Sequence, residues 1–130
     1  MRLLSICAGL FFLTTTALGF GKPEHSGVVI DTANISGGKQ FTLKIKAMNN
    51  MVINFDAPWK LEIKGHEGLG LTKASYAKED MDEKLPGFLV QSTPENPKGT
   101  LEYSLTAFVC TKDKTQCFRE VHSGKQDWTK

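Results

Sequence analysis

Two cysteines in the last quarter of the chain, Cys110 and Cys117, have the side chains and the spacing best suited to chemistry. They lie in the segment VCTKDKTQCF, with Asp113 and Lys114 midway between them. Residues at equal distances from a hairpin tip face each other, which pairs Cys110 with Cys117. Opposed residues of antiparallel strands are ~4.5 to 5.5 Å apart at Cα, within the range of a disulfide. Asp-Lys is a mediocre turn dipeptide, but a four-residue loop keeps the same register.

The strand before this hairpin predicts which face the bridge occupies. Thr100 to Cys110 alternates strictly, and its apolar face carries Leu101, Tyr103, Leu105, Ala107 and Val109. Cys110 therefore points away from this predicted core face, together with Phe108. The hairpin register places Arg119 opposite Phe108. We expect a disulfide near the surface, flanked by an aromatic ring and a cation.

Two interpretations of such a bridge are open. Closing a loop of ~8 residues restricts the unfolded chain by about 2.5 kcal/mol, which is a modest structural gain. A short-range, outward-facing bridge beside Lys112, Lys114 and Arg119 can also exchange with other thiols, because positive charge favours the thiolate leaving group. The spacing alone therefore predicts either a structural crosslink or a redox-active pair.

The N-terminus predicts export. Met1 to Gly19 contains one Arg, an apolar run from Leu3 to Leu13, and small or polar residues before Gly19, which is the layout of a secretory signal peptide. The apolar run is shorter than the ~20 residues that span a bilayer. We expect cleavage near Gly19, no stable membrane insertion afterwards, and a periplasmic or secreted protein. Cys7 is lost with the leader, which leaves the even pair typical of exported proteins with a disulfide.

The composition is that of an ordinary globular protein. Of the 130 residues, 40% are hydrophobic and 23% are charged, which excludes a disordered or collagen-like chain. The formal net charge is +2 without a basic run, so we expect no nucleic-acid partner. His25, His66 and His122 lack metal-ligand spacing, and no nucleophile-elbow motif indicates a hydrolase. We expect neither a metal nor another cofactor.

Short alternating segments between turn signals predict the fold. Besides Thr100 to Cys110, the strand candidates are Val28–Ile30, Phe41–Ala47, Met51–Phe55, Trp59–Lys64, Phe88–Gln91 and Cys117–His122. Gly65 to Gly87, which includes a charged run, is expected to be a solvated connection with at most two helical turns. Trp59 and Tyr103 fall on core faces. We predict an all-β protein, an immunoglobulin-like antiparallel β-sandwich of about seven short strands, as a single domain over residues 20–130.

The Cys-x6-Cys hairpin after a long alternating strand, with Ala57-Pro58-Trp59-Lys60-Leu61 upstream, resembles the N-terminal domain of the DsbD family of thiol-disulfide interchange proteins. The resemblance covers about Gln40 to His122. It implies an immunoglobulin-like periplasmic module with Cys110 and Cys117 as its redox pair and Cys117 as the sulfur of the mixed disulfide. The implied partners are a membrane thiol-disulfide transporter, which donates electrons, and thioredoxin-like or other oxidised proteins.

The chain departs from the family pattern near the second cysteine. The family usually has five residues between the cysteines and an aromatic-Pro-Pro sequence after them, whereas six residues intervene here and Phe118-Arg119-Glu120 follows. The membrane segment and the Cys-x-x-Cys domain of the full-length family are also missing, so the chain would act as a detached module. A loop shields the disulfide in the family. The candidate here is Tyr76 to Phe88, with Met81, Leu85 or Phe88 as the covering side chain.

Three classes of function remain open at this point. The first is an electron carrier, a thiol-disulfide oxidoreductase that exchanges its bridge with protein partners. The second is a non-catalytic, immunoglobulin-like secreted binding domain with an inert hairpin disulfide. The third is a metal-binding periplasmic protein. A reduction potential separates the first two, because a structural bridge lies below about −300 mV and an exchanging pair lies well above it.

Overall fold

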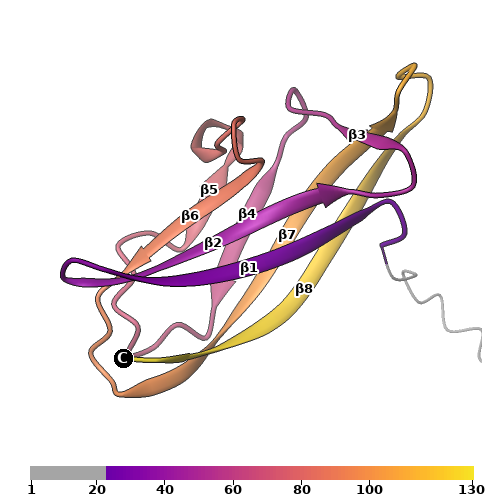
Figure 1. Ribbon diagram of the computed structural model, residues 1–130. Helices are drawn as coiled ribbons and strands as arrows, with labels where there is room; N and C mark the ends of the chain where they lie inside the picture. The colour runs from indigo at the N-terminus through magenta and orange to yellow at the C-terminus, as the bar shows by residue number, and fades with distance from the viewer. Residues whose placement is uncertain (1–22) are drawn as a thin grey trace, which may run out of the picture.

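Strands dominate the computed structural model, which describes residues 23–130. Within these residues, eight antiparallel strands form two sheets that pack into a sandwich, so the predicted all-β fold is confirmed (Figure 1). The strands are β1 (Ser26–Ile35), β2 (Gly38–Ala47), β3 (Met51–Ile53), β4 (Lys60–Lys64), β5 (Ser75–Ala77), β6 (Gly87–Ser92), β7 (Lys98–Thr111) and β8 (Cys117–Thr129). The described part holds no helix long and apolar enough to cross a membrane. The signal peptide expected over residues 1–19 lies outside the described residues.

The pairing of the strands makes β7 the centre of the second sheet. The first sheet has the order β1-β2-β6. In the second sheet, β8 pairs with β7 along its whole length, from Lys98 opposite Thr129 to Cys110 opposite Cys117. The other edge of β7 pairs first with β4 and then, nearer the hairpin, with β3. β5 pairs with β4. Both cysteines therefore lie on the longest hairpin of the fold.

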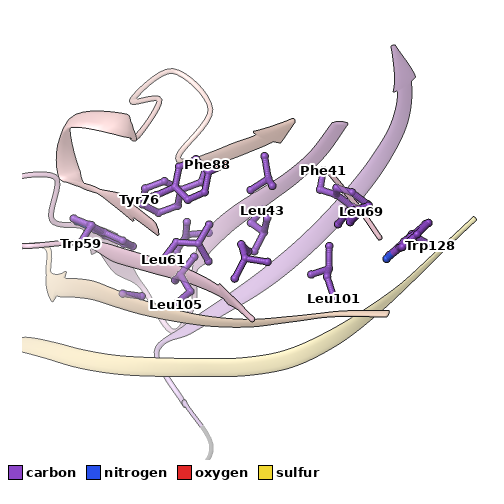
Figure 2. Packing of buried hydrophobic residues seen from close by; sticks show 14 of the residues in the cluster. Phe41, Leu43, Trp59, Leu61, Leu69, Tyr76, Phe88, Leu101, Leu105 and Trp128 are labelled. Carbon is purple, nitrogen blue, oxygen red and sulfur yellow. The ribbon is translucent and has the colours of Figure 1, made fainter. Parts of the chain in front are cut away.

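The core lies between the sheets and follows the alternation of the sequence (Figure 2). Fully buried side chains come from alternate positions of β2, β4, β6 and β7, namely Phe41, Leu43, Leu61, Phe88, Val90, Leu101, Leu105, Ala107 and Val109. Burying each of the larger ones contributes about 1.5 to 3 kcal/mol. Trp59 and Trp128 occupy opposite ends of this cluster. The ring of Trp128 covers Gly99, where a Cβ atom would come within 2.6 Å of the indole carbon Cζ2.

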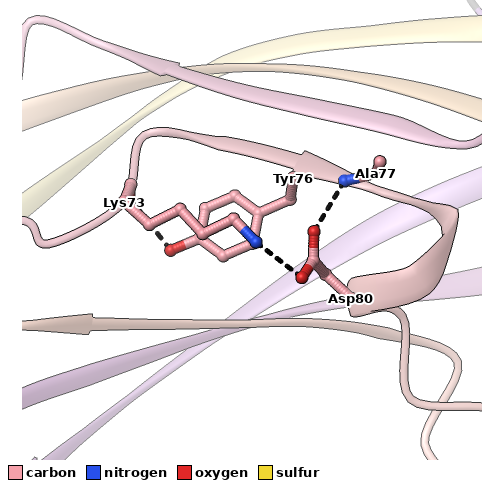
Figure 3. Close-up of polar contacts among 4 residues, drawn as sticks. All are labelled: Lys73, Tyr76, Ala77 and Asp80. Carbon is pink, nitrogen blue, oxygen red and sulfur yellow. Dashed lines mark hydrogen bonds and ion pairs between the residues drawn. The ribbon is translucent and has the colours of Figure 1, made fainter.

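The connection between β4 and β6 contains more structure than the sequence predicts. It forms β5 and a short 3-10 helix, η1 (Lys78–Asp80). Tyr76 of β5 packs edge-on against Phe88, with ring centroids 6.1 Å apart, which anchors the connection to the core. On the solvent side, the Asp80 carboxylate accepts hydrogen bonds from the Ala77 backbone N–H at 2.9 Å and from Lys73 Nζ at 2.5 Å (Figure 3).

Two strands are longer than predicted. The sequence predicts Val28–Ile30 and Cys117–His122, whereas β1 and β8 extend to Ile35 and Thr129. The additional residues of β1 are mostly polar and exposed, and those of β8 include Gly, Gln and charged residues, so neither shows apolar alternation. These residues form strands because β1 pairs residue by residue with β2, and β8 with β7. Backbone hydrogen bonding to a partner leaves no signal in the apolar pattern of a single segment.

Candidate functional site

Cys110 and Cys117 form a disulfide across the end of the β7–β8 hairpin, as the spacing predicts. The two residues are direct register partners, and their Cα atoms are 4.0 Å apart. The next pair toward the tip is hydrogen-bonded, because the Thr111 N–H donates to the Gln116 carbonyl at 2.8 Å. The cysteines therefore occupy a non-hydrogen-bonded pair, where opposed residues of antiparallel strands lie closest. Strand pairing alone brings the two sulfurs together.

Asp113 organises the turn that sets this register. Its Oδ1 atom accepts hydrogen bonds from Thr111 Oγ1 at 2.5 Å, from the Thr115 N–H at 3.1 Å and from Thr115 Oγ1 at 2.8 Å. The bonds from Thr111 and Thr115 hold the pKa of Asp113 below its ordinary value. Lys114 adopts the left-handed conformation with φ of 59°, and its N–H donates to the Thr111 carbonyl. Four residues separate the hydrogen-bonded pair Thr111 and Gln116, so the longer of the two predicted loops is the one present.

The two half-cystines differ in exposure. Cys117 is exposed, whereas Cys110 is only 3% exposed. The difference arises because β3 pairs with β7 beside the bridge, with Val52 as the register partner of Cys110, whereas Cys117 lies on the edge strand β8. The prediction of a surface bridge is therefore right for Cys117 and wrong for Cys110. Cys117 is therefore the exposed half-cystine of the bridge.

A cleft of about 290 Å³ lies beside the bridge. Besides the two cysteines, it is lined by Val52, Ile53, Asn54, Phe55, Asp56 and Lys114. Trp59 holds this lining in place, because its Nε1–H donates to the Asn54 carbonyl at 2.6 Å. The Asn54 N–H in turn donates to the Phe108 carbonyl of β7 at 3.0 Å. The segment that covers the bridge is thus the end of β3 and the connection that follows it.

The covering side chains expected between Tyr76 and Phe88 lie elsewhere. Phe88 is fully buried in the core and pairs with Leu43 of β2, in the sheet that does not carry the disulfide. Leu85 is exposed, and Met81 packs against the edge of the core. None of these three side chains lines the cleft beside the disulfide. The expectation was wrong because the pairing of β3 with β7, which the sequence does not show, brings a different connection to the bridge.

Phe108 and Arg119 flank the bridge as register partners, as predicted. Arg119 is exposed on the outer face of β8. Phe108 is half-buried instead of lying free on the surface, with its ring 6.0 Å from that of Trp59 in an edge-on arrangement. β4 pairs with β7 only as far as Thr106, and β3 begins to pair at Val109. On the edge of β7 away from β8, Phe108 therefore has no register partner and lies next to the segment that carries Trp59.

A polar cluster that the sequence does not predict lies on the inner face of β8, next to Cys117. Phe118 follows Cys117, and the His25 ring stacks on it with centroids 4.0 Å apart. Ser26 Oγ donates to Glu120 Oε1 at 2.5 Å and lies 2.7 Å from His122 Nε2. The cluster fastens the start of β1 to β8. Glu120 and His122 share a face by strand periodicity, but nothing in the sequence shows that Ser26 meets them.

This cluster is not arranged as a catalytic triad. In a triad the imidazole lies between the hydroxyl and the carboxylate, whereas here the hydroxyl of Ser26 lies between Glu120 and His122. Ser26 is also buried at 2% exposure, out of reach of a substrate carbonyl. Among residues 23–130, no three His, Cys, Asp or Glu side chains gather closely enough to hold a metal ion. The arrangement fits an attachment between the two sheets.

Local contacts shift the pKa values of Glu120 and His122. Burial would raise the pKa of Glu120, but hydrogen bonds from Ser26 and from the backbone N–H groups of His25 and Glu24 outweigh burial and leave the pKa lowered. Burial lowers the pKa of His122, while the charge of Glu120 opposes that change. Both groups therefore bind protons more readily in the unfolded chain than in the folded protein.

We expect acid to destabilise the protein in two stages. Because the folded pKa of His122 is lowered, stability falls as the pH drops below its ordinary value of 6.5. The lowered pKa of Glu120 stabilises the fold above the ordinary value of 4.5, and this contribution is lost as the pH falls through the folded pKa. Urea unfolding between pH 7 and pH 3 measures both stages. Glu120→Gln should make the lower stage smaller, because Asp113 and other carboxylates with lowered pKa values still contribute to it, and the control Glu67→Gln should leave it unchanged. Equal profiles for the two variants would contradict the assignment.

Comparisons with known proteins identify no family for the chain. A scan against protein-family models finds no match, and searches of curated proteins and of solved structures find none either. The chemistry open to this chain therefore follows from the hairpin itself: a disulfide with one exposed and one buried half-cystine, beside a small cleft.

Proposed function

We propose that this protein is an exported thiol-disulfide exchange module that passes reducing equivalents between protein partners through the Cys110–Cys117 disulfide. The observation that carries the proposal is the asymmetry of the bridge, with Cys117 exposed on an edge strand and Cys110 covered by β3. An inert crosslink needs no such difference. A disulfide that exchanges with proteins benefits from it, because only one sulfur is then open to attack.

The exchange proceeds through a mixed disulfide. The thiolate of a reduced partner attacks Sγ of Cys117, the Cys110–Cys117 bond breaks, and Cys110 leaves as a thiolate. A second thiolate of the partner then attacks the partner sulfur of the mixed disulfide and releases Cys117. The partner ends as a disulfide and the hairpin as a dithiol, so two electrons have moved to this protein. The reverse sequence delivers them to an oxidised partner.

Positive charge near the bridge supports this chemistry. Lys114 lines the cleft beside the disulfide, and Arg119 is exposed close to Cys117 on the same strand. Cations at these positions favour the leaving thiolate. The resemblance to the DsbD family and the leader-like N-terminus point to the same role in the periplasm or outside the cell. A membrane thiol-disulfide transporter and thioredoxin-like proteins are the partners that this role implies.

A redox titration tests the proposal. In glutathione buffers of graded potential, we expect the bridge to be half reduced at a potential above about −300 mV, as for exchanging disulfides. Alkylation of free thiols followed by intact mass measures the reduced fraction. The double variant Cys110→Ser/Cys117→Ser gives the background of alkylation. A bridge that remains oxidised down to potentials below about −300 mV overturns the proposal.

A non-catalytic, immunoglobulin-like binding domain with an inert disulfide is the alternative. The observation in its favour is the burial of Cys110 beneath β3, since a covered sulfur resists both attack and release. On this alternative the bridge crosslinks two strands that are already paired along their length, so its reduction should cost no more than about 2.5 kcal/mol. The redox titration separates the two functions.

A further inference from the structure

Among the strands of residues 23–130, β1 has a long free edge without the usual protection. Edge strands in soluble proteins are normally short, covered or charged. Here β3 and β5 have three residues each, two isolated bridges cover part of the outer edge of β6, and β8 carries Arg119, Glu120, Lys125 and Asp127. β1 has ten residues, a single charged side chain, Asp31, and no proline. It pairs with β2 on one side only.

The backbone groups on this free edge can be assigned. The His25 carbonyl accepts a hydrogen bond from the Met48 N–H at 2.8 Å, so odd-numbered residues of this strand point their backbone groups at β2. The hydrogen bond from the Ile45 N–H to the Pro86 carbonyl agrees with this assignment. Ile45 opposes Val28 but directs its backbone groups away from β1, so the backbone groups of the even-numbered Val28 do not bond to β2. The N–H and C=O groups on the free edge therefore belong to even-numbered residues, including Ile30, Thr32 and Asn34.

The accessible part of the edge is the half nearest the β1–β2 turn. All five residues from Asp31 to Ile35 are exposed. On the outer face, Val29 is 48% exposed and Ile35 is 36% exposed. The other end of β1 is fastened to β8 through Ser26. Thr32 lies near the middle of the open part.

We propose that a second copy of this chain adds its β1 to this edge, antiparallel and about a two-fold axis through Thr32. The axis keeps each face of the sheet on its own side. Thr32 then opposes Thr32 of the second copy as a hydrogen-bonded pair, and on either side of it Ile30 of one copy opposes Asn34 of the other. Val29 then lies opposite Ile35 of the second copy, which brings together the two exposed apolar side chains of the strand. The two three-stranded sheets become one sheet of six.

Charge disfavours one neighbouring register, and the attachment of β1 to β8 disfavours another. An axis through Asp31 would place two carboxylates opposite each other, which is unfavourable. An axis through Ile30 would bring Asn34 of the second copy to Ser26, where β1 is already attached to β8. With the axis at Thr32, Asp31 faces Ala33 of the second copy. A two-fold pairing also closes the assembly, because each copy uses its one long edge strand, among the described strands, that is not protected by several charged residues.

The proposed pairing is independent of the disulfide chemistry. The β1–β2 turn and the β7–β8 hairpin lie at opposite ends of the sandwich (Figure 1). The second copy would therefore leave Cys117 and the adjacent cleft open. A monomeric protein with an exchanging bridge would overturn only the pairing, and a dimeric protein with an inert bridge would overturn only the exchange function.

Opposite charges at Ala33 test the register. Ala33 is exposed, so neither Ala33→Asp nor Ala33→Lys should disturb the fold. In the dimer, Ala33→Asp places a second carboxylate opposite Asp31 twice, whereas Ala33→Lys places a cation there. Sedimentation velocity should show dimers of the unchanged protein at about 100 µM, since the interface is small. Ala33→Asp should weaken dimerisation about tenfold at low salt, and Ala33→Lys should leave it unchanged or strengthen it.

Thr32→Pro provides a variant that removes a hydrogen bond of the interface. The Thr32 N–H points at the free edge, so proline there removes no bond to β2, and proline is tolerated at such edge positions. We expect this variant to fold and to be monomeric. A protein that stays monomeric at about 1 mM overturns the proposal. Equal weakening by Ala33→Asp and Ala33→Lys, or a dimer that survives Thr32→Pro in a folded variant, overturns it as well.

Discussion

Cys110→Ser should accumulate a mixed disulfide through Cys117, while Cys117→Ser should trap far less. The reason is the exposure of the two residues, since Cys117 lies on the edge strand and Cys110 lies beneath β3. When the protein delivers electrons to an oxidised partner, Cys110 is the thiolate that resolves the mixed disulfide, so without it the complex between Cys117 and that partner persists. Non-reducing gels of envelope extracts that contain each variant measure the trapped species. We expect at least about a tenfold excess for Cys110→Ser.

The comparison needs a control for the buried position. A serine hydroxyl at position 110 would be covered and could disturb the hairpin, so Cys110→Ala serves as the apolar counterpart. Both variants should trap alike. Alkylation of the purified single-cysteine variants gives a partner-free measure, in which Cys117 should react faster than Cys110. Equal trapping and equal alkylation by the two cysteines would show that exposure does not select the sulfur. No trapping by either, together with a bridge that resists glutathione, would favour the inert binding domain.

The hairpin could be predicted because its determinants are local. The separation of Cys110 and Cys117 and the alternation of the preceding strand give the register, the pairing of Arg119 with Phe108, and the core side of Leu101 and Leu105. Each of these follows from the period of two in a strand and the symmetry of a hairpin. The β-sandwich itself follows from the number of such segments and from the lack of a long amphipathic pattern of helical period in the sequence.

The environment of the bridge could not be predicted, because it depends on pairings between distant segments. Met51–Phe55 is visible as a strand in the sequence, but nothing there shows that Val52 pairs with Cys110. The same holds for Ser26, which meets Glu120 from the other end of the chain. The sequence of a short apolar segment does not show which strand it pairs with. The burial of Cys110 and the identity of the connection that covers it are therefore seen only in the structure.

Trp59→Ala should destabilise the protein more than any change to the hairpin. The indole is 2% exposed, packs edge-on against Phe108, and donates its N–H to the Asn54 carbonyl. Truncation of a buried tryptophan costs about 3 to 5 kcal/mol, which urea unfolding at neutral pH measures directly. Trp59→Phe keeps most of the apolar contact but loses the hydrogen bond, so we expect a loss of only about 1 to 2 kcal/mol.

The same substitution should also uncover the disulfide. Trp59 holds the Asn54 end of the connection that lines the cleft, so its removal frees the segment that covers Cys110. Reduction by dithiothreitol under native conditions should therefore be faster in Trp59→Ala. Trp128→Ala is the matched control, because Trp128 is 4% exposed at the opposite end of the core (Figure 2). Trp128→Ala should lower the free energy of unfolding by a similar amount, but the disulfide should not be reduced faster. Equal acceleration in both variants would mean that lower global stability, and not the loss of cover over Cys110, governs access to the bridge.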